Sequence, residues 1–103
     1  QLRHPFNFML ANRYRSGSDH VGWHSDNERD MGVRPVIASL SLGASRVFRV
    51  RPKSGGKSMG WLLQHGSLLV MWGDSQSLFK HSVPRTAQPA GERVNLTFRY
   101  VSK

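Results

Sequence analysis

Cysteine is absent from this chain of 103 residues. Without thiols there is no disulfide framework, no cysteine-based zinc site and no thiol nucleophile, so any chemistry must come from histidine, aspartate and arginine. No apolar run approaches the roughly 20 residues that span a bilayer, and no leader-like pattern opens the chain. We therefore expect one small, soluble, intracellular and monomeric domain with no membrane partner.

Acidic residues are also scarce, with 6 Asp and Glu against 15 Lys and Arg, which gives a formal charge of +9. Arg46, Arg49, Arg51, Lys53 and Lys57 form a run without an intervening acid. Arginine pairs bidentately with phosphate, so this excess favours a nucleic-acid partner. A solvated surface strand is the alternative interpretation, and charge alone does not choose between DNA and RNA.

Helical periodicity is missing as well, since no window of a dozen residues repeats apolar positions at i, i+3, i+4 and i+7. Short runs of strand length recur instead, at residues 6–14, 36–43, 46–51, 59–64, 67–72, 78–83 and 94–101. Turn residues separate them at 16–19, 52–56, 65–66, 73–75 and 89–91, and residues 25–35 are polar enough to be a loop. The pattern predicts an all-β sandwich or jelly-roll barrel with little or no helix.

Two potential metal ligands stand close together in the sequence. His24 and Asp26 are two residues apart, so in an extended segment both side chains point to the same side. The third ligand must come from elsewhere, and we favour His81 because it lies in a strand-like run; the other histidines are His4, His20 and His65. Two histidines and one carboxylate on one face are typical of non-haem Fe(II) oxygenases. Surface or core histidines without a metal remain the alternative.

The last predicted strand sorts its residues by type. Apolar side chains occupy one face and polar ones the other, the polar set being Arg93, Asn95, Thr97 and Arg99. The simpler interpretation is a surface strand with solvated arginines. However, two arginines about 20 Å apart along a strand can lean together over a small dicarboxylate. Asn12 and Tyr14 offer an amide and a phenol in the same i, i+2 relation, so the sequence predicts a pocket for a metal and a doubly anionic organic acid.

In their order along the chain, these residues resemble the AlkB family of Fe(II)- and 2-oxoglutarate-dependent nucleic-acid dealkylases. The matching segments are Asn12-Arg13-Tyr14, His24-x-Asp26, His65-Gly66-Ser67-Leu68, His81 and Arg93-x-Asn95-x-Thr97-Phe98-Arg99. The HxD motif and the distal histidine occur across the wider dioxygenase superfamily, whereas the RxNxTFR strand is specific to this branch. Residues 37–43 are most similar to the subgroup that acts on N-methylated adenine and cytosine.

The resemblance implies a double-stranded β-helix that oxidatively removes alkyl groups from DNA or RNA bases, using Fe(II), 2-oxoglutarate and O2. Fe(II) would be bound by His24, Asp26 and His81, and His24 would form one wall of the base pocket. 2-Oxoglutarate would be held by Asn12, Tyr14, Arg93, Asn95 and Arg99, with Arg93 at its distal carboxylate. Asn27 and Glu28, in the loop after the metal motif, would contact the substrate. The basic run itself, independently of the resemblance, adds Arg49, Arg51 and Lys53 as expected contacts to the phosphates of the substrate strand.

Two departures from the family pattern affect the substrate. Asn27 stands where the subgroup usually has an aspartate that accepts from the exocyclic amine of the base. The family's N-terminal lid has no counterpart, so we expect residues 1–103 to be a single catalytic core. A superfamily enzyme acting on a protein or small molecule is one rival prediction, and a non-catalytic basic β domain that binds nucleic acid is another.

Overall fold

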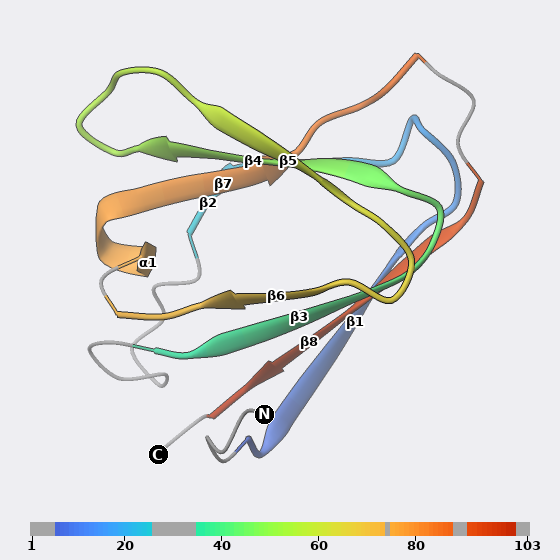
Figure 1. The fold of residues 1–103 in the computed structure, drawn as a ribbon, viewed down its shortest axis with the longest axis horizontal. Coiled ribbons are helices and arrows are strands. Elements are labelled where there is room, and N and C mark those ends of the chain that lie inside the picture. The colour runs from blue at the N-terminus through green and yellow to red at the C-terminus, as the bar shows by residue number, and fades with distance from the viewer. Residues whose placement is uncertain (1–5, 26–34, 74, 88–90, 101–103) are drawn as a thin grey trace.

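A computed structural model describes residues 6–25, 35–73, 75–87 and 91–100. They form two four-stranded antiparallel sheets that face each other as two layers (Figure 1). The first sheet has the order β1 (Phe8–Tyr14), β8 (Arg93–Arg99), β3 (Ile37–Gly43) and β6 (Leu68–Met71). The second has the order β2 (Val21–His24), β7 (Phe79–Val83), β4 (Arg46–Pro52) and β5 (Met59–Leu63). Most consecutive strands alternate between the layers, which is the jelly-roll arrangement.

The predicted all-β jelly roll is confirmed. The differences are local: β2 is not among the expected strand runs, and one helical turn, α1 (Ser75–Leu78), precedes β7. β2 has only four residues and an irregular register against β7, so it lacks the alternation that identifies a strand. Within the described ranges no helix is long and apolar enough to cross a membrane.

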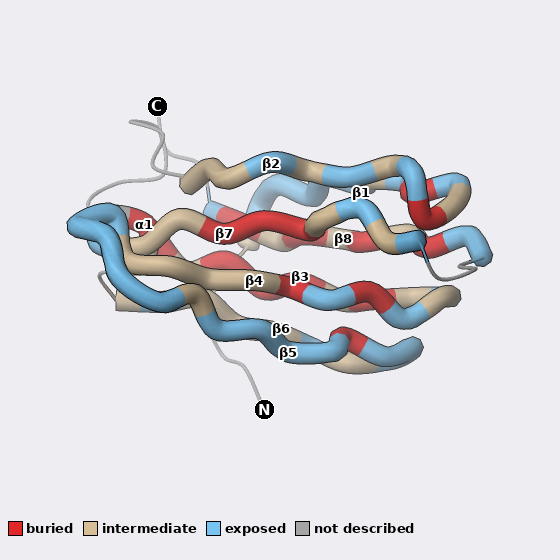
Figure 2. Tube along the Cα trace, turned by 90° about the horizontal axis from the view of Figure 1, so that it is seen from above, coloured by how far each residue is buried: buried red, intermediate tan, exposed pale blue. Residues whose placement is uncertain are grey.

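The polar side chains of β8 face the interior of the fold. Arg93, Asn95, Thr97 and Arg99 are all buried, whereas the apolar residues between them are partly exposed. β8 lies in the middle of the first sheet, and the second sheet covers the face that carries these side chains. Figure 2 shows buried (red) segments along β8. The interpretation of β8 as a surface strand with solvated arginines is therefore wrong, and the space between the sheets is a polar chamber.

A small hydrophobic cluster closes one part of this chamber. Tyr14, Phe48, Leu63 and Val83 are buried against one another, and partly buried Val21, Val50, Leu69 and Met71 pack around them. Full burial of such a side chain stabilises a fold by about 1.5–3 kcal/mol. Because the cluster joins strands from both sheets, it fixes the separation of the two layers.

Arg46 corrects the prediction of one continuous phosphate-facing run. Its side chain is 2% exposed and donates hydrogen bonds to the backbone oxygens of Ser16 (3.2 Å), Asp19 (2.8 Å) and Pro84 (2.8 Å). The alternation of side chains along β4 points this residue inward. There its guanidinium donates hydrogen bonds to three loop carbonyls. Arg46 is therefore a structural residue that ties two loops to the sheet.

The loop between β3 and β4 depends on a glycine. Gly43 has a φ of 92°, in the left-handed region, and a Cβ there would overlap the backbone oxygen of Glu92. The same oxygen accepts a 2.9 Å hydrogen bond from the amide of Ala44. This close approach holds the β3–β4 turn against the start of β8.

Candidate active site

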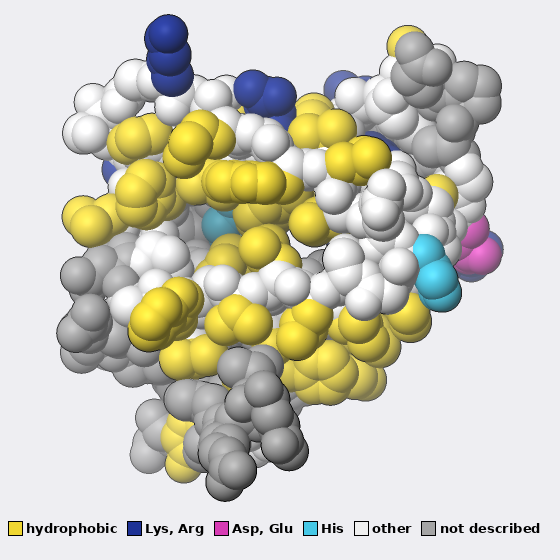
Figure 3. All heavy atoms as spheres, viewed as in Figure 1, with side chains coloured by type: hydrophobic (Ala, Val, Ile, Leu, Met, Phe, Trp, Pro, Cys, Tyr) yellow, Lys and Arg dark blue, Asp and Glu magenta, His cyan; other side chains and the backbone are white. Residues whose placement is uncertain are grey.

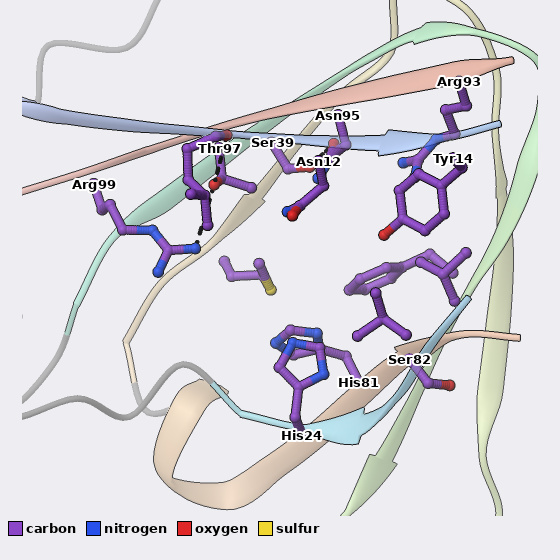
Figure 4. A pocket seen from close by; sticks show the side chains of 15 residues that line it. Asn12, Tyr14, His24, Ser39, His81, Ser82, Arg93, Asn95, Thr97 and Arg99 are labelled. Carbon is purple, nitrogen blue, oxygen red and sulfur yellow. Dashed lines mark hydrogen bonds between the residues drawn. The ribbon is translucent and has the colours of Figure 1, made fainter. Parts of the chain in front are cut away.

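The site is a cavity of about 240 Å³ between the two sheets (Figure 4). The first sheet contributes most of the polar lining, and the second contributes the two histidines. Its walls are Leu10, Asn12, Tyr14, Val21, His24, Ser39, Phe48, Met71, His81, Ser82, Val83, Arg93, Asn95, Thr97 and Arg99. Strands of both sheets thus converge on one pocket, which includes most of the side chains that the sequence predicted to be functional.

His24 and His81 lie side by side where β2 pairs with β7. Their ring centroids are 4.4 Å apart, with 66° between the ring planes. Two imidazoles bound about 90° apart to one ion, at metal–nitrogen distances of about 2.1 Å, have centroids roughly 4.5 Å apart. The pair therefore fits a shared metal ion.

The tautomer of His24 is the one that a metal-binding histidine needs. Its Nδ1 lies 2.8 Å from the backbone oxygen of Gly22. A carbonyl oxygen only accepts, so Nδ1 carries the hydrogen and Nε2 is the nitrogen that could coordinate a metal.

The remaining predicted ligands are placed differently. Asp26, like His4, lies outside the described residues. His20 is exposed, and the Nδ1 atom of His65 accepts a hydrogen bond from the amide of Gly43 in a turn far from the pair. Within the described ranges no third histidine or acid joins His24 and His81. The carboxylate that the sequence predicts two residues after His24 therefore stays a prediction.

Arg93 lies at one end of the cavity, where it could bind an anionic ligand. It is 1% exposed; Nη2 donates to Ser41 Oγ at 2.9 Å, while Nε and Nη1 are buried without a hydrogen-bond partner. Neither carboxylate of the described residues, Asp19 and Glu92, reaches it, since these pair with Arg15 and Arg13. Burial lowers the pKa of Arg93 below its usual value. A buried guanidinium with two nitrogen donors that lack partners is suited to bind the carboxylate of a ligand.

Tyr14 packs between two arginines. The Arg93 guanidinium lies 5.1 Å from the Tyr14 ring centroid and that of Arg46 lies 5.5 Å from it. Burial raises the pKa of the phenol, and the attraction of Arg93 only partly offsets this. Tyr14 therefore stays protonated at neutral pH and can donate a hydrogen bond to an anion held by Arg93.

The other side chains of β8 are held in place by short polar contacts. Asn95 Oδ1 accepts a 2.7 Å hydrogen bond from Ser39, and Arg99 Nη2 donates to Thr97 Oγ1 at 3.3 Å. Asn12 lies opposite Asn95 in the β1–β8 register. Figure 4 shows Arg93 and Arg99 at opposite ends of this row, with the histidines across the cavity from its middle. A dicarboxylate along the row would place one end near the histidine pair.

Sequence reasoning missed several residues that line the cavity or hold its lining side chains in place. Ser39 and Ser41 are inward residues of β3, and the Ser-x-Ser alternation was the available signal. Phe48 stacks on His81 with centroids 5.3 Å apart, but a single phenylalanine in a strand gives no indication of such a role.

The residues expected to contact substrate lie mostly outside the cavity. Arg49 donates to Ser58 Oγ at 2.6 Å, and the guanidinium of Arg51 lies 4.5 Å from the Trp23 ring centroid. Lys53 is exposed in the turn after β4. Asn27 and Glu28 lie outside the described residues. The site thus has two parts, an internal cavity and a basic exterior on the second sheet.

The sequence model of the 2OG-Fe(II) oxygenase superfamily matches residues 2–99. This chain belongs to that superfamily. It is 45% identical over 107 residues to the Rattus norvegicus "Alpha-ketoglutarate-dependent dioxygenase alkB homolog 3", covering 95% of this chain and 36% of the rat protein. It is 44% identical over 104 residues to the Homo sapiens "DNA oxidative demethylase ALKBH2", covering 93% of this chain and 40% of the human protein.

A solved structure has the same architecture. It is described as "The structure of OsALKBH1" and superposes with a TM-score of 0.77 at 26% identity, over 94% of this chain and 49% of the other. The resemblance to the AlkB family is confirmed by these relatives. The chain spans well under half the length of the curated relatives it matches.

Proposed function

We propose that this chain is the catalytic core of an enzyme that oxidatively dealkylates N-alkylated bases in DNA or RNA. Fe(II) would be held by His24, His81 and Asp26, and 2-oxoglutarate by the row from Arg93 to Arg99 with Asn12 and Tyr14. The proposal depends on one observation. The adjacent rings of His24 and His81 lie on one side of a cavity, and on its other side lies a buried arginine with two donors that have no hydrogen-bond partner.

Each side chain has a task that its surroundings support. Arg93 and Tyr14 would bind the distal carboxylate of 2-oxoglutarate, while Arg99, at the other end of the row, would neutralise the end nearer the metal. Ser39 holds the Asn95 carboxamide, so that its amide nitrogen faces a fixed direction. The two imidazoles would orient the ion, and the apolar cluster around Phe48 limits the entry of water.

The bound iron would supply the oxidising chemistry, in which O2 converts 2-oxoglutarate to succinate and CO2 and inserts the second oxygen atom into an N-methyl C–H bond. The hydroxymethyl product then splits its C–N bond, which releases formaldehyde and returns the N–H of the base. A base in a duplex must leave its stack to reach His24.

The cations of β4 and of the turn after it are suited to hold the phosphates of such a substrate. Arg49, Arg51 and Lys53 carry no acidic partner among the described ion pairs, and few carboxylate or amide side chains near them could read base edges. Their contribution to binding would therefore be electrostatic and independent of sequence. The names of the relatives, which include a DNA oxidative demethylase, support a nucleic-acid substrate.

The direct experiment measures succinate and formaldehyde with Fe(II), 2-oxoglutarate and an oligonucleotide that carries N1-methyladenine or N3-methylcytosine. We expect both products in equal amounts, and neither product with His81→Ala. Succinate formed equally with methylated and unmethylated oligonucleotide, without formaldehyde, would contradict the nucleic-acid substrate and favour a superfamily enzyme with another substrate. Absence of both products together with unchanged oligonucleotide binding by His24→Ala would favour the non-catalytic domain.

A further inference from the structure

The turn at residues 64–67 joins β5 to β6, which are edge strands of the two sheets. Figure 3 shows mainly hydrophobic and uncharged side chains on the side of the molecule that carries these two strands. The turn does not line the active-site cavity, although it contains the segment His65-Gly66-Ser67 that resembles the AlkB family. Its role must therefore come from its contacts, which reach β3.

Three hydrogen bonds attach the turn to the end of β3. The amide of Gly66 donates to the oxygen of Ser41 at 2.7 Å, and the amide of Ser41 donates to the oxygen of Ser67 at 3.0 Å. The amide of Gly43 donates to Nδ1 of His65 at 2.9 Å. Alternate residues of a strand direct their amides to the same side, so the His65 ring takes the place of the next backbone acceptor after Ser67.

The donor and the acceptor of the bond between Gly43 and His65 are unambiguous. A backbone amide only donates, so Nδ1 of His65 accepts and the imidazole carries its hydrogen on Nε2. The ring is exposed at the surface and lines no part of the active-site cavity. Replacing it therefore removes a support of β3 without opening the core.

The end of β3 holds Arg93 at two points. Gly43 lies opposite Arg93 in the β3–β8 register, and a Cβ on this glycine would lie 3.4 Å from the Arg93 Cα. Two residues earlier in β3, Ser41 Oγ accepts the 2.9 Å hydrogen bond from Arg93 Nη2. Nε and Nη1 have no hydrogen-bond partner, so the guanidinium is directed by this bond and by its packing on the Tyr14 ring.

We propose that His65 is a positioning residue for the 2-oxoglutarate site. Its ring fixes the end of β3 and, through Ser41, the direction of the Arg93 guanidinium. A guanidinium that already points in one direction loses less conformational entropy when a carboxylate binds, so His65 favours ligand binding without touching the ligand. This role depends on the proposed function only because Arg93 is assigned there to a carboxylate of 2-oxoglutarate.

The test compares His65→Leu, which removes the acceptor, with His65→Asn, whose Oδ1 lies close to the position of Nδ1 and can accept the same hydrogen bond. Titration of 2-oxoglutarate into the Mn(II)-loaded chain should show about 2- to 12-fold weaker binding for His65→Leu, the range expected for one neutral hydrogen bond. His65→Asn should restore most of the affinity. Mn(II) affinity without 2-oxoglutarate should be equal in all three chains, because the histidine pair belongs to the second sheet.

Two further variants separate this role from general damage to the turn. Gln64→Leu is the matched control, because Gln64 is exposed in the same turn and its side chain makes no hydrogen bond within the described part of the chain. It should bind 2-oxoglutarate like wild type. Ser41→Ala tests the route to Arg93: adding His65→Leu to this variant should weaken binding by less than it does in the wild-type chain.

A measurement without ligand reports on Arg93 directly. Side-chain ¹⁵N–¹H spectra, assigned by comparison with Arg93→Met, give the rate at which the guanidinium rotates about its Nε–Cζ bond. We expect slow rotation in wild type and His65→Asn and faster rotation in His65→Leu, because the bond to Ser41 resists this rotation.

The proposal is overturned if His65→Leu matches wild type in either measurement, since water would then replace the imidazole at Gly43. It is also overturned if His65→Asn restores nothing, if Gln64→Leu or Mn(II) binding is affected equally, or if His65→Leu keeps its full effect without the Ser41 hydroxyl. A wild-type chain that binds no 2-oxoglutarate would refute the proposed function instead, and the rotation of Arg93 alone then decides the role of His65.

Discussion

Replacing Arg93 by methionine should weaken 2-oxoglutarate binding without the loss of stability that usually follows a change at a buried residue. Methionine keeps most of the length of the side chain but removes the guanidinium, whose Nε and Nη1 are buried without a hydrogen-bond partner. A hydrogen bond to a charged group contributes about 1.5–3 kcal/mol, which corresponds to an increase of about 10- to 140-fold in the dissociation constant.

Stability should respond in the opposite direction. Burial already lowers the pKa of Arg93, so the fold holds this charge at a cost in free energy. Arg93→Met loses only the bond to Ser41 and the contact of the guanidinium with the Tyr14 ring. We expect the free energy of unfolding without 2-oxoglutarate to be unchanged or raised, and the stabilisation by saturating 2-oxoglutarate to shrink. Calorimetric titration and urea unfolding measure the two quantities. An unchanged dissociation constant would refute the assignment of the carboxylate to Arg93.

Three further predictions concern other residues. Arg46→Met should lower the free energy of unfolding by at least about 3 kcal/mol in urea, because three loop carbonyls lose a charged donor. The contribution of Tyr14 to stability is complete below about pH 10 and is lost as the pH rises through its raised pKa, so Tyr14→Phe should lose stability less steeply above pH 10. Neutralising Arg49, Arg51 and Lys53 together should weaken oligonucleotide binding equally across sequences and reduce the salt slope by about 0.7–0.9 for each phosphate that is no longer neutralised.

Each of these predictions has an outcome that would contradict it. Wild-type stability of the Arg46 variant would show that the three carbonyls are equally well satisfied by water. Parallel pH curves for wild type and Tyr14→Phe would mean that the phenol titrates alike in the folded and unfolded chain. For the salt slope, the control is Arg13→Gln with Arg15→Gln, since Glu92 and Asp19 already pair with these cations. An equal slope change per charge removed in this control would show that net charge, not position, governs binding.

Site residues could be predicted from the sequence where they belong to a strand with a periodic pattern of polar and apolar residues. The alternation in β8 separated Arg93 and Asn95 from the apolar residues correctly, but it could not say which face was inside. That depends on the second sheet packing over one face of β8, which is a long-range property of the fold. Pattern alone therefore left the polar row open to two interpretations.

Isolated residues were harder to interpret from the sequence. Arg46 stands in the same run as Arg49 and looks like another surface cation, yet the carbonyls that bind it come from loops 27 to 38 residues away. Gln76 gave no signal either, because a glutamine in a turn is ordinarily exposed, and only the packing of α1 against β7 places it beside His81. Residues whose role depends on tertiary packing of this kind lie beyond pattern analysis.

The central claim is that one cavity holds both a metal and 2-oxoglutarate, and coupled binding tests it most directly. Mn(II) and 2-oxoglutarate are titrated separately and together into the wild-type chain and into His81→Ala. We predict one of each per chain, with each ligand tightening the other by the same factor, as reciprocity requires, and loss of this coupling in His81→Ala. Binding of 2-oxoglutarate that is indifferent to Mn(II), or coupling that survives in His81→Ala, would contradict the account.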